Sequence, residues 1–193
     1  MSNSHALPRI AFQGARGAFS EEAAIKLLGK KIELVSRSTF AALFSSFDDR
    51  VADYLLVPIE NTLAGTVQPA YELLLQSGLP VCDEVTIQIE QNLIGCPGAC
   101  FENITVVESH PVALAQCERF FAEHPQLKRL GSDDTAGSVA QVVRRGDQTR
   151  AAIAGRLAAQ SYGGVILREH LEDDRQNYTR FVLLAATGAA ARP

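Results

Sequence analysis

A short segment near the C-terminus, Asn177-Tyr178-Thr179-Arg180-Phe181, places a hydroxyl, a permanent cation and an aromatic ring side by side. On a strand, Thr179 and Phe181 would face one side and Arg180 the other. A turn at the start of the strand can still direct the hydroxyl and the guanidinium toward one pocket. A hydroxyl that gives up a proton beside a cation that holds a carboxylate indicates chemistry on a small organic anion. The alternative interpretation is a surface turn entering a strand, with Arg180 in solvent.

Four further segments, each expected to be a loop-to-helix junction, carry glycine or short polar side chains. These loops are Gly14–Ser20, Asn61–Thr66, Ser109–Pro111 and Asp134–Ser138. Helix N-termini present unpaired N–H groups and the positive end of the helix dipole, so they favour anions. In α/β sheets, ligands bind outside the carboxyl ends of the strands, where we expect these loops to lie. Each loop alone is also explained by an ordinary N-cap. Together with the Thr179-Arg180 pair, they indicate a carboxylate-bearing ligand.

The chain offers few acids and bases suited to hydrolysis. His110 is the only histidine in one of these loops. The sequence contains no Gly-x-Ser-x-Gly elbow, phosphate loop or dinucleotide fingerprint. This pattern favours chemistry that depends on positioning and one weak acid, without a cofactor.

Short apolar runs alternate with amphipathic segments along the chain, and this alternation occurs twice. It predicts an α/β fold with mostly parallel sheets. We expect two α/β lobes with a ligand cleft between them. The first lobe would comprise residues 9–86 and 168–187, and the second residues 87–167. Residues 1–8 are expected to be a disordered tail and residues 188–193 a C-terminal tail.

Local signals predict where several helices begin and end. Ser20 is expected to cap a helix that stops at Gly29, and Thr39 to cap the next one. Asp134 opens a later helix. A single helix is expected from Pro111 through Phe121.

The bulk properties exclude several classes of protein. The 193 residues carry a net charge of −4, so no basic field attracts nucleic acid. No apolar run approaches the ~18 residues of a membrane span, and the N-terminus lacks a signal-peptide pattern. We therefore expect a cytoplasmic protein whose cysteines are thiols. Cys96 and Cys100 have a CxxxC spacing, but no second ligand pair is present, so we expect no metal site.

Five motifs in order resemble those of the prephenate dehydratase family. They are Gly14-Ala-Arg-Gly-Ala-Phe-Ser20, Val57-Pro-Ile-Glu-Asn-Thr62, Ser109-His110-Pro111 leading to Gln116-Cys117, Asp133-Asp134-Thr135-Ala136-Gly137, and Asn177-Tyr178-Thr179-Arg180-Phe181. The resemblance covers about residues 9–186. It implies a two-lobed fold like that of type II periplasmic binding proteins, with the substrate in the cleft. It also implies conversion of prephenate to phenylpyruvate, water and CO2 in phenylalanine biosynthesis.

The resemblance also implies roles for particular residues. Thr179 corresponds to the catalytic threonine of the family's Thr-Arg-Phe motif, and the other catalytic positions are Glu60, Asn61, Ser109 and Gln116. A structural hydrogen-bonding role for Glu60 is an equal alternative. The positions expected to bind substrate are Arg16, Thr62, His110, Thr135, Ala136, Arg180 and Phe181.

Some features depart from the family pattern. The Asp-Asp-Thr-Ala-Gly form is similar to that of plant members, which often act on arogenate, the amino analogue of prephenate. The alternatives are therefore an arogenate dehydratase or, in another class, a non-catalytic module that binds small carboxylates. The family usually carries a C-terminal ACT domain that binds phenylalanine. Its absence from this sequence predicts no phenylalanine feedback within the polypeptide, and a homodimer formed through the catalytic lobes.

Overall fold

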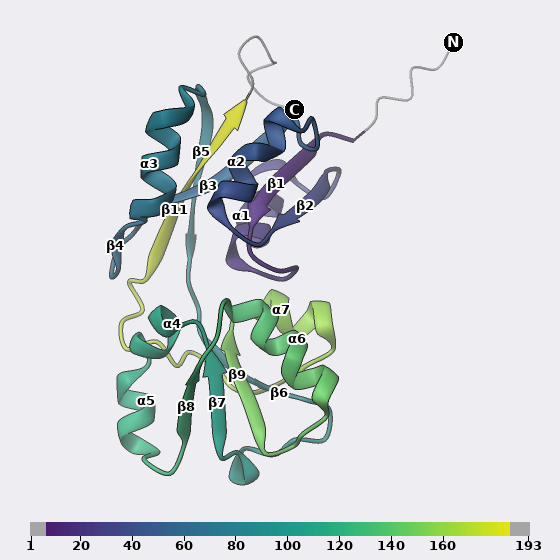
Figure 1. Cartoon of the computed structure of the whole chain (residues 1–193). Coiled ribbons are helices and arrows are strands. Elements are labelled where there is room, and N and C mark those ends of the chain that lie inside the picture. The colour runs from purple at the N-terminus through teal and green to yellow at the C-terminus, as the bar shows by residue number, and fades with distance from the viewer. Residues whose placement is uncertain (1–6, 186–193) are drawn as a thin grey trace. The chain divides into compact units, whose positions relative to one another are not determined.

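The computed structural model describes residues 7–185, which form two compact units, each built on one β-sheet (Figure 1). Within the described residues, unit 1 comprises 7–13, 20–87 and 179–185, and unit 2 comprises 14–19 and 88–178. The prediction of two α/β lobes is confirmed. The tails predicted at 1–8 and 188–193 lie outside the described residues, apart from Leu7 and Pro8.

The boundaries of the units differ from those expected from sequence. Residues 168–178, expected in the first lobe, belong to unit 2, as do residues 14–19. Backbone hydrogen bonds explain the first difference. Leu171 N donates to Gln91 O at 2.8 Å, and Asp173 N donates to Gln116 O at 2.7 Å, so the segment is tied to unit 2.

The sheet of unit 1 has the strand order β2-β1-β3-β11-β5, with β4 paired to β3. Its strands are β1 (Arg9–Gln13), β2 (Glu33–Arg37), β3 (Tyr54–Asn61), β4 (Gly65–Thr66), β5 (Val81–Gln88) and β11 (Tyr178–Ala185). β1 pairs in parallel with β2 and β3, whereas β11 and β4 are antiparallel to β3. The sheet is therefore mixed.

The helices of unit 1 are α1 (Phe19–Leu28), α2 (Phe40–Asp48) and α3 (Gln68–Ser77). α2 and α3 pack against one face of the sheet, where Leu43 and Ala70 join a buried cluster with Val57 and Leu184. Alternate residues of β11 are directed to the two faces of the sheet. Val182 and Leu184 thus lie on the α2–α3 side.

Two of the predicted helix starts in unit 1 have different outcomes. Thr39 caps α2 as expected, since its Oγ1 accepts a hydrogen bond from Ala42 N at 3.1 Å. The expectation that Ser20 caps α1 is wrong, because the helix begins at Phe19 and Ser20 is buried in its first turn. The helix ends before Gly29, whose φ of +77° suits glycine.

The sheet of unit 2 has the order β10-β6-β9-β7-β8. Its strands are β6 (Asn92–Gly95), β7 (Val106–Ser109), β8 (Lys128–Gly131), β9 (Arg150–Ala154) and β10 (Val165–Arg168). β7 is parallel to β8 and β9, whereas β6 is antiparallel to β9 and β10. The expectation of mostly parallel sheets is wrong for both units, because apolar runs predict buried strands but not their direction.

The helices of unit 2 are α4 (Pro111–Ala115), α5 (Glu118–Glu123), α6 (Thr135–Arg145) and α7 (Arg156–Tyr162), with a short 3-10 helix η1 (Phe101–Asn103). Asp134 caps α6 as predicted. The single helix expected from Pro111 through Phe121 is instead two helices. Gln116 ends α4, and the carboxylate of Asp173 accepts from Glu118 N at 2.8 Å at the start of α5.

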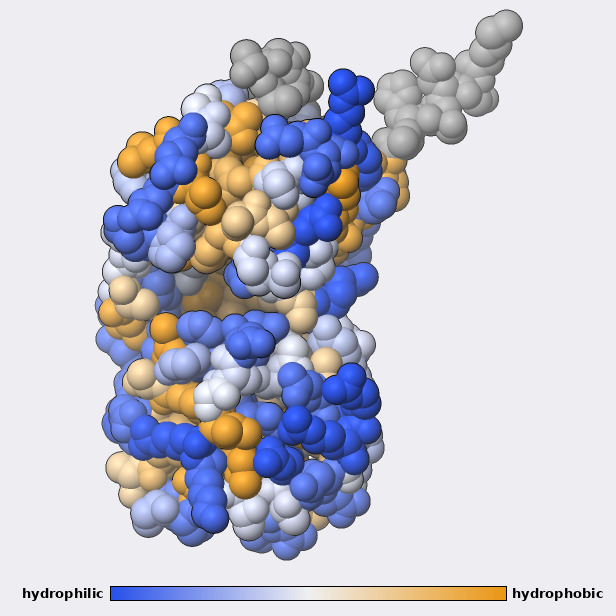
Figure 2. All heavy atoms as spheres, viewed as in Figure 1, coloured by the Kyte–Doolittle hydropathy of each residue, from blue (hydrophilic) through white to orange (hydrophobic). Residues whose placement is uncertain are grey.

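The surface viewed in Figure 2 mixes hydrophilic and hydrophobic side chains on both units, with hydrophobic surface over α3. In the described part of the chain, no helix is both long and apolar enough to cross a membrane. The four cysteines are all reduced thiols. Residues 7–185 contain no group of three or more His, Cys, Asp or Glu side chains that could hold a metal ion.

Candidate functional site

The hydroxyl of Thr179 lies beside the amide of Asn61 in unit 1. The two residues are opposite each other on the antiparallel strands β11 and β3. Asn61 Nδ2 donates a hydrogen bond of 2.9 Å to Thr179 Oγ1, and both side chains are largely buried. The structure thus brings together two of the predicted catalytic residues from positions 118 residues apart.

The orientation of the Asn61 amide is fixed by the turn that follows it. Its Oδ1 accepts from Leu63 N at 3.0 Å and from Ala64 N at 2.8 Å. Because the oxygen is used by two backbone donors, the NH2 group must face Thr179. Thr179 Oγ1 is therefore an acceptor toward Asn61, and its own proton is available to another acceptor.

Glu60 and Arg180 lie on the opposite face of the same two strands. They form the neighbouring cross-strand pair, and both are exposed. Arg180 Nε donates to Glu84 Oε2 at 3.1 Å, and Arg180 Nη2 makes a second, shorter bond to the same oxygen. The expectation that Thr179 and Arg180 turn toward one pocket is wrong, because strand alternation separates them to the two faces of the sheet.

The remaining candidates of unit 1 differ in exposure. Phe181 is 2% exposed and belongs to the core, on the same face of β11 as Thr179. Thr62 is exposed in the turn between β3 and β4. This turn joins two strands of a hairpin, so the expectation that the Asn61–Thr66 loop is a loop-to-helix junction is wrong. Its polar groups shape the turn and direct Asn61.

Gln116 lies in a second buried amide network, in unit 2. Its Oε1 accepts from Asn177 Nδ2 at 3.0 Å and from Gln91 Nε2 at 3.2 Å. Asn177 and Gln91 are both almost fully buried. With its oxygen used twice, Gln116 directs its NH2 group away from both partners. In this network the buried Oε1 of Gln91 has no hydrogen-bond partner among the described residues.

Ser109 ends strand β7 and is fully buried. Its Oγ donates a hydrogen bond of 2.6 Å to Ile153 O on the neighbouring strand β9. The hydroxyl proton is therefore committed to the backbone. While this bond persists, Ser109 can accept a hydrogen bond from a substrate but cannot donate one.

Two of the predicted anion-binding junctions already use their own side chains. His110 Nδ1 accepts from Val112 N at 3.2 Å at the start of the short helix α4. Asp134 Oδ1 accepts from Gly137 N at the start of α6, beside Thr135 and the buried Ala136. A carboxylate at this position offsets the positive end of the helix dipole, so α6 is a weaker anion site than the sequence suggested.

The glycine loop before α1 holds the exposed Arg16 in unit 2. Gly17 has a φ of +81°, and a Cβ on it would lie 2.7 Å from the Cα of Ala158 in α7. Only glycine fits there without moving the backbone. The close approach fixes the loop that carries Arg16, one of the predicted contacts for a carboxylate.

Two features of unit 2 were not predicted from the sequence. Gln91 was missed, although the adjacent amides Gln91 and Asn92, directly before the apolar pair Leu93-Ile94, are a signal for buried hydrogen bonding. Cys117, next to Gln116, is fully buried, and burial raises the pKa of its thiol well above the ordinary range. Burial therefore favours the protonated thiol, which is a poor nucleophile.

The fold and the site define a two-unit α/β protein whose candidate site contains the buried amides and hydroxyls of Asn61, Ser109, Asn177 and Thr179. A sequence model of the prephenate dehydratase family matches residues 10–189, and the chain belongs to this family. The resemblance seen in the five motifs is confirmed.

Two curated relatives illustrate the similarity. Arogenate dehydratase 1 of Petunia hybrida is 38% identical over 178 residues, which cover 92% of this chain and 42% of the relative. A bifunctional chorismate mutase/prephenate dehydratase of Neisseria gonorrhoeae is 36% identical over 184 residues, covering 94% and 51%. The chain thus spans about half the length of the curated relatives it matches.

Solved structures agree with the family. A prephenate dehydratase from Arthrobacter aurescens, in complex with L-Phe, is 27% identical with a TM-score of 0.84, covering 94% of this chain and 61% of that one. GqqA, described as a novel type of quorum quenching acylase, is 33% identical with the same TM-score of 0.84, covering 96% and 66%.

Proposed function

We propose that this chain catalyses the decarboxylating dehydration of prephenate to phenylpyruvate, water and CO2, without a cofactor. One structural observation supports this proposal in addition to the match to the family. The amide of Asn61 donates to Thr179 Oγ1, which leaves the hydroxyl proton of Thr179 available for a leaving group.

The reaction suits a site with a weak, well-placed proton donor. Prephenate is a dicarboxylate with a C4 hydroxyl on a cyclohexadiene ring, and loss of CO2 and hydroxide makes the ring aromatic. Thr179 would donate to the departing oxygen and stabilise the developing hydroxide. The hydrogen bond from Asn61 polarises the threonine hydroxyl in the same direction and strengthens its donation. General acid catalysis of this kind typically contributes about 10²–10⁴-fold.

Other residues would position the substrate. Gln116 presents an NH2 group, and Ser109 Oγ can accept a hydrogen bond. We assign carboxylate binding first to Arg16 and to backbone amides, because Arg180 faces away from Thr179 and is paired with Glu84. Glu60 is exposed on that same face, which argues against direct catalysis by its carboxylate.

The test is an assay of pure protein with prephenate. We expect phenylpyruvate, measured by its enolate absorbance, and a loss of about 10²–10⁴-fold in kcat in Thr179→Val. Thr179→Ser keeps the hydroxyl and is the matched control. Near-normal turnover in Thr179→Val would refute the assignment of the proton donor.

A second candidate is the amino analogue arogenate, because named relatives include arogenate dehydratases. The same assay, read as phenylalanine formed from arogenate, distinguishes it. Binding of either compound without product would favour the non-catalytic module.

We prefer dehydration to the acyl transfer suggested by the name of GqqA, because an activated nucleophile needs a base in hydrogen-bond reach. The side-chain partner of Thr179 is an amide donor.

We also propose that the protein acts in the cytoplasm as a homodimer. Four reduced thiols suit a reducing compartment. Exposed apolar side chains such as Val81 and Val165 would gain from burial between two copies. Light scattering should then give twice the chain mass of 20.8 kDa, and a mass of one chain would contradict the dimer.

A further inference from the structure

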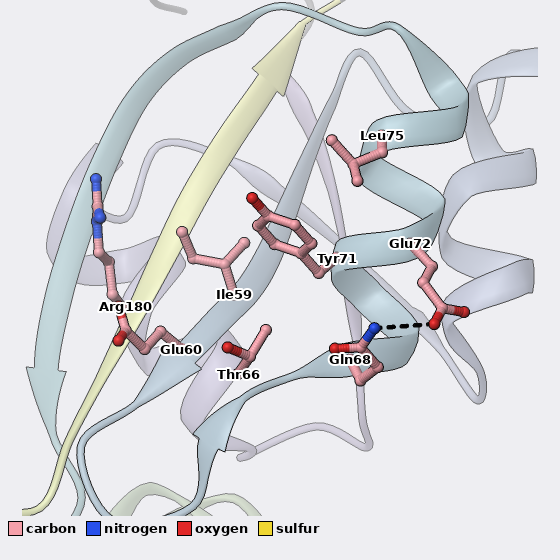
Figure 3. Close-up of a pocket in the computed structure, with 8 residues that line it drawn as sticks. All are labelled: Ile59, Glu60, Thr66, Gln68, Tyr71, Glu72, Leu75 and Arg180. Atoms are coloured by element: carbon pink, nitrogen blue, oxygen red, sulfur yellow. Dashed lines mark hydrogen bonds between the residues drawn. The ribbon is translucent and has the colours of Figure 1, made fainter.

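The charged side chains next to the candidate site residues differ in exposure. In unit 1, Glu60 and Arg180 are exposed and line a pocket beside helix α3 (Figure 3). Strand alternation directs both of them away from the proposed catalytic pair. In unit 2, by contrast, Glu172 adjoins the amide network of Gln116, and its side chain is only 1% exposed. The proposed mechanism gives this buried carboxylate no role.

The carboxylate of Glu172 is only partly satisfied. Its Oε2 accepts from Gln91 N at 2.8 Å, whereas its Oε1 accepts no hydrogen bond from the described residues. His170 Nδ1 lies 3.6 Å from Oε1, which is too long for a hydrogen bond. The other buried glutamate of unit 2, Glu108, is instead paired with two arginines. Because an unpaired buried acceptor lowers stability, the fold alone does not explain Glu172.

Glu172 holds a residue on which Gln116 depends. Leu171 N donates to Gln91 O at 2.8 Å, so residues 171–172 bind both the C=O and the N–H of Gln91. The Gln91 side chain then donates from Nε2 to Gln116 Oε1 at 3.2 Å. Since Gln91 Oε1 has no partner in the described part of the chain, this one hydrogen bond holds the end of the side chain. Its direction therefore depends on where Glu172 and Leu171 place the backbone.

We propose that Glu172 is a positioning residue for the dehydration. Its carboxylate fixes Gln91, and Gln91 fixes the direction in which Gln116 presents its NH2 group to the substrate. The effect on turnover rests on the proposed function, whereas the effect on Gln116 does not. Because Asn177 Nδ2 also donates to Gln116 Oε1, at 3.0 Å, loss of Glu172 loosens Gln116 without releasing it. Substrate binding is then weakened, while the step at Thr179 is preserved.

The test is steady-state kinetics of Glu172→Leu and Glu172→Gln with prephenate and with arogenate. Leucine removes the acceptor of the Gln91 N–H, whereas glutamine keeps one in the same shape. We expect KM to rise about tenfold in Glu172→Leu with kcat within about twofold of wild type, and both to stay within about twofold in Glu172→Gln. Where Glu172→Leu is too unstable to assay, Glu172→Ala carries the same expectation. An unchanged KM would overturn the proposal.

Two comparisons separate positioning from a general loss of structure. Val142→Ala truncates a fully buried side chain on α6 that makes none of these hydrogen bonds, so it should lower stability and keep the wild-type KM. In Gln91→Leu the side-chain link to Gln116 is already lost, so adding Glu172→Leu should raise KM no further. A rise in KM in Val142→Ala, or an additive rise in the double variant, would overturn the assigned route through Gln91.

The side-chain amide signal of Gln116 in ¹⁵N NMR measures the positioning without turnover. The signal is assigned by its loss in Gln116→Leu. It should shift in Glu172→Leu and in Gln91→Leu, and much less in Glu172→Gln and Val142→Ala. An unshifted signal in Glu172→Leu would overturn the proposal even if KM rose. If the signal shifts as expected but the wild-type protein turns over neither prephenate nor arogenate, the link from Glu172 to Gln116 stands and the proposed function fails.

Discussion

At the scale of single residues, Asn61 sets the direction in which a hydroxyl can act. Two backbone donors hold its oxygen, so its NH2 group faces Thr179 and makes Thr179 Oγ1 an acceptor. On the proposed function, a neutral pair of this kind would supply a proton donor without a charged acid. His110, the histidine of the candidate site, is used in a helix cap.

Asn61→Asp tests this geometry. The introduced carboxylate can still accept from Leu63 N and Ala64 N, so the turn should persist, but its second oxygen would now accept the proton of Thr179. We expect kcat with prephenate to fall about 10²-fold near neutral pH and to recover partly as the pH falls, because the carboxyl group can donate again once it is protonated. Asn103→Asp, at an exposed position, is the control. A pH-independent rate close to wild type would contradict the assigned direction of the bond.

Gln91 allows a test in which activity and stability separate. Its Nε2 holds Gln116, whereas its buried Oε1 has no partner among the described residues. Gln91→Leu removes both the useful donor and the unsatisfied acceptor, so we expect thermal stability to stay within about 1 kcal/mol of wild type. Turnover should fall roughly tenfold, mainly through KM, because Gln116 loses one of its two positioning contacts. Unchanged KM and kcat would show that Gln91 has only a structural role.

The face of the sheet on which a side chain lies was predicted correctly where it depends only on the alternation of side chains along a strand. Thr179 and Phe181 on one face and Arg180 on the other follow directly from the period of two. The idea of a shared pocket for Thr179 and Arg180 failed because it required a departure from that period. The partners of Gln116 could not be predicted, since Gln91 and Asn177 meet it through tertiary contacts alone.

At the scale of elements, local caps were predictable and long-range caps were not. Thr39 and Asp134 accept from N–H groups three residues ahead, a pattern written in the local sequence. The break between α4 and α5 depends on Asp173, which lies 55 residues from Glu118. The period of two predicts a strand but not its direction relative to its neighbours. The prediction of mostly parallel sheets therefore failed, because both sheets are mixed.

Asp173 offers a test of that long-range cap. Its two carboxylate oxygens accept from Glu118 N at 2.8 Å and Arg119 N at 2.9 Å. Asp173→Ala should lower the free energy of unfolding by about 1–2 kcal/mol, the usual loss when a helix cap is removed. Asp173→Asn keeps an acceptor and should lose less. Chemical denaturation measures both, and equal stability of all three proteins would contradict the capping role.

At the scale of the whole molecule, the two units differ in how the chain builds them. Unit 2 is nearly continuous, residues 88–178 with only the short segment 14–19 added. Unit 1 is assembled from segments on both sides of unit 2, and its adjacent strands β5 and β11 flank that insertion. Closing an unstructured loop of about 90 residues costs roughly 4 kcal/mol of entropy.

Folded unit 2 removes most of that entropic penalty. Gln88 Nε2 donates to Arg175 O at 2.9 Å, and Ile89 N donates to Asn177 O at 2.8 Å. These bonds hold the two ends of the insertion side by side, where β5 and β11 must begin their pairing. Unit 1 should therefore depend on unit 2 for its stability, whereas unit 2 should depend much less on unit 1.

Matched core truncations test this dependence. Leu55 in unit 1 and Ile153 in unit 2 are both fully buried, and truncation to alanine should cost about 2–5 kcal/mol in either case. Native-state hydrogen exchange should show lower protection in unit 1 alone for Leu55→Ala, but in both units for Ile153→Ala. If Leu55→Ala lowered protection equally throughout, or Ile153→Ala affected unit 2 alone, the chain would lack this hierarchy. Unit 1 would then gain no stability from the folded insertion that joins its strands.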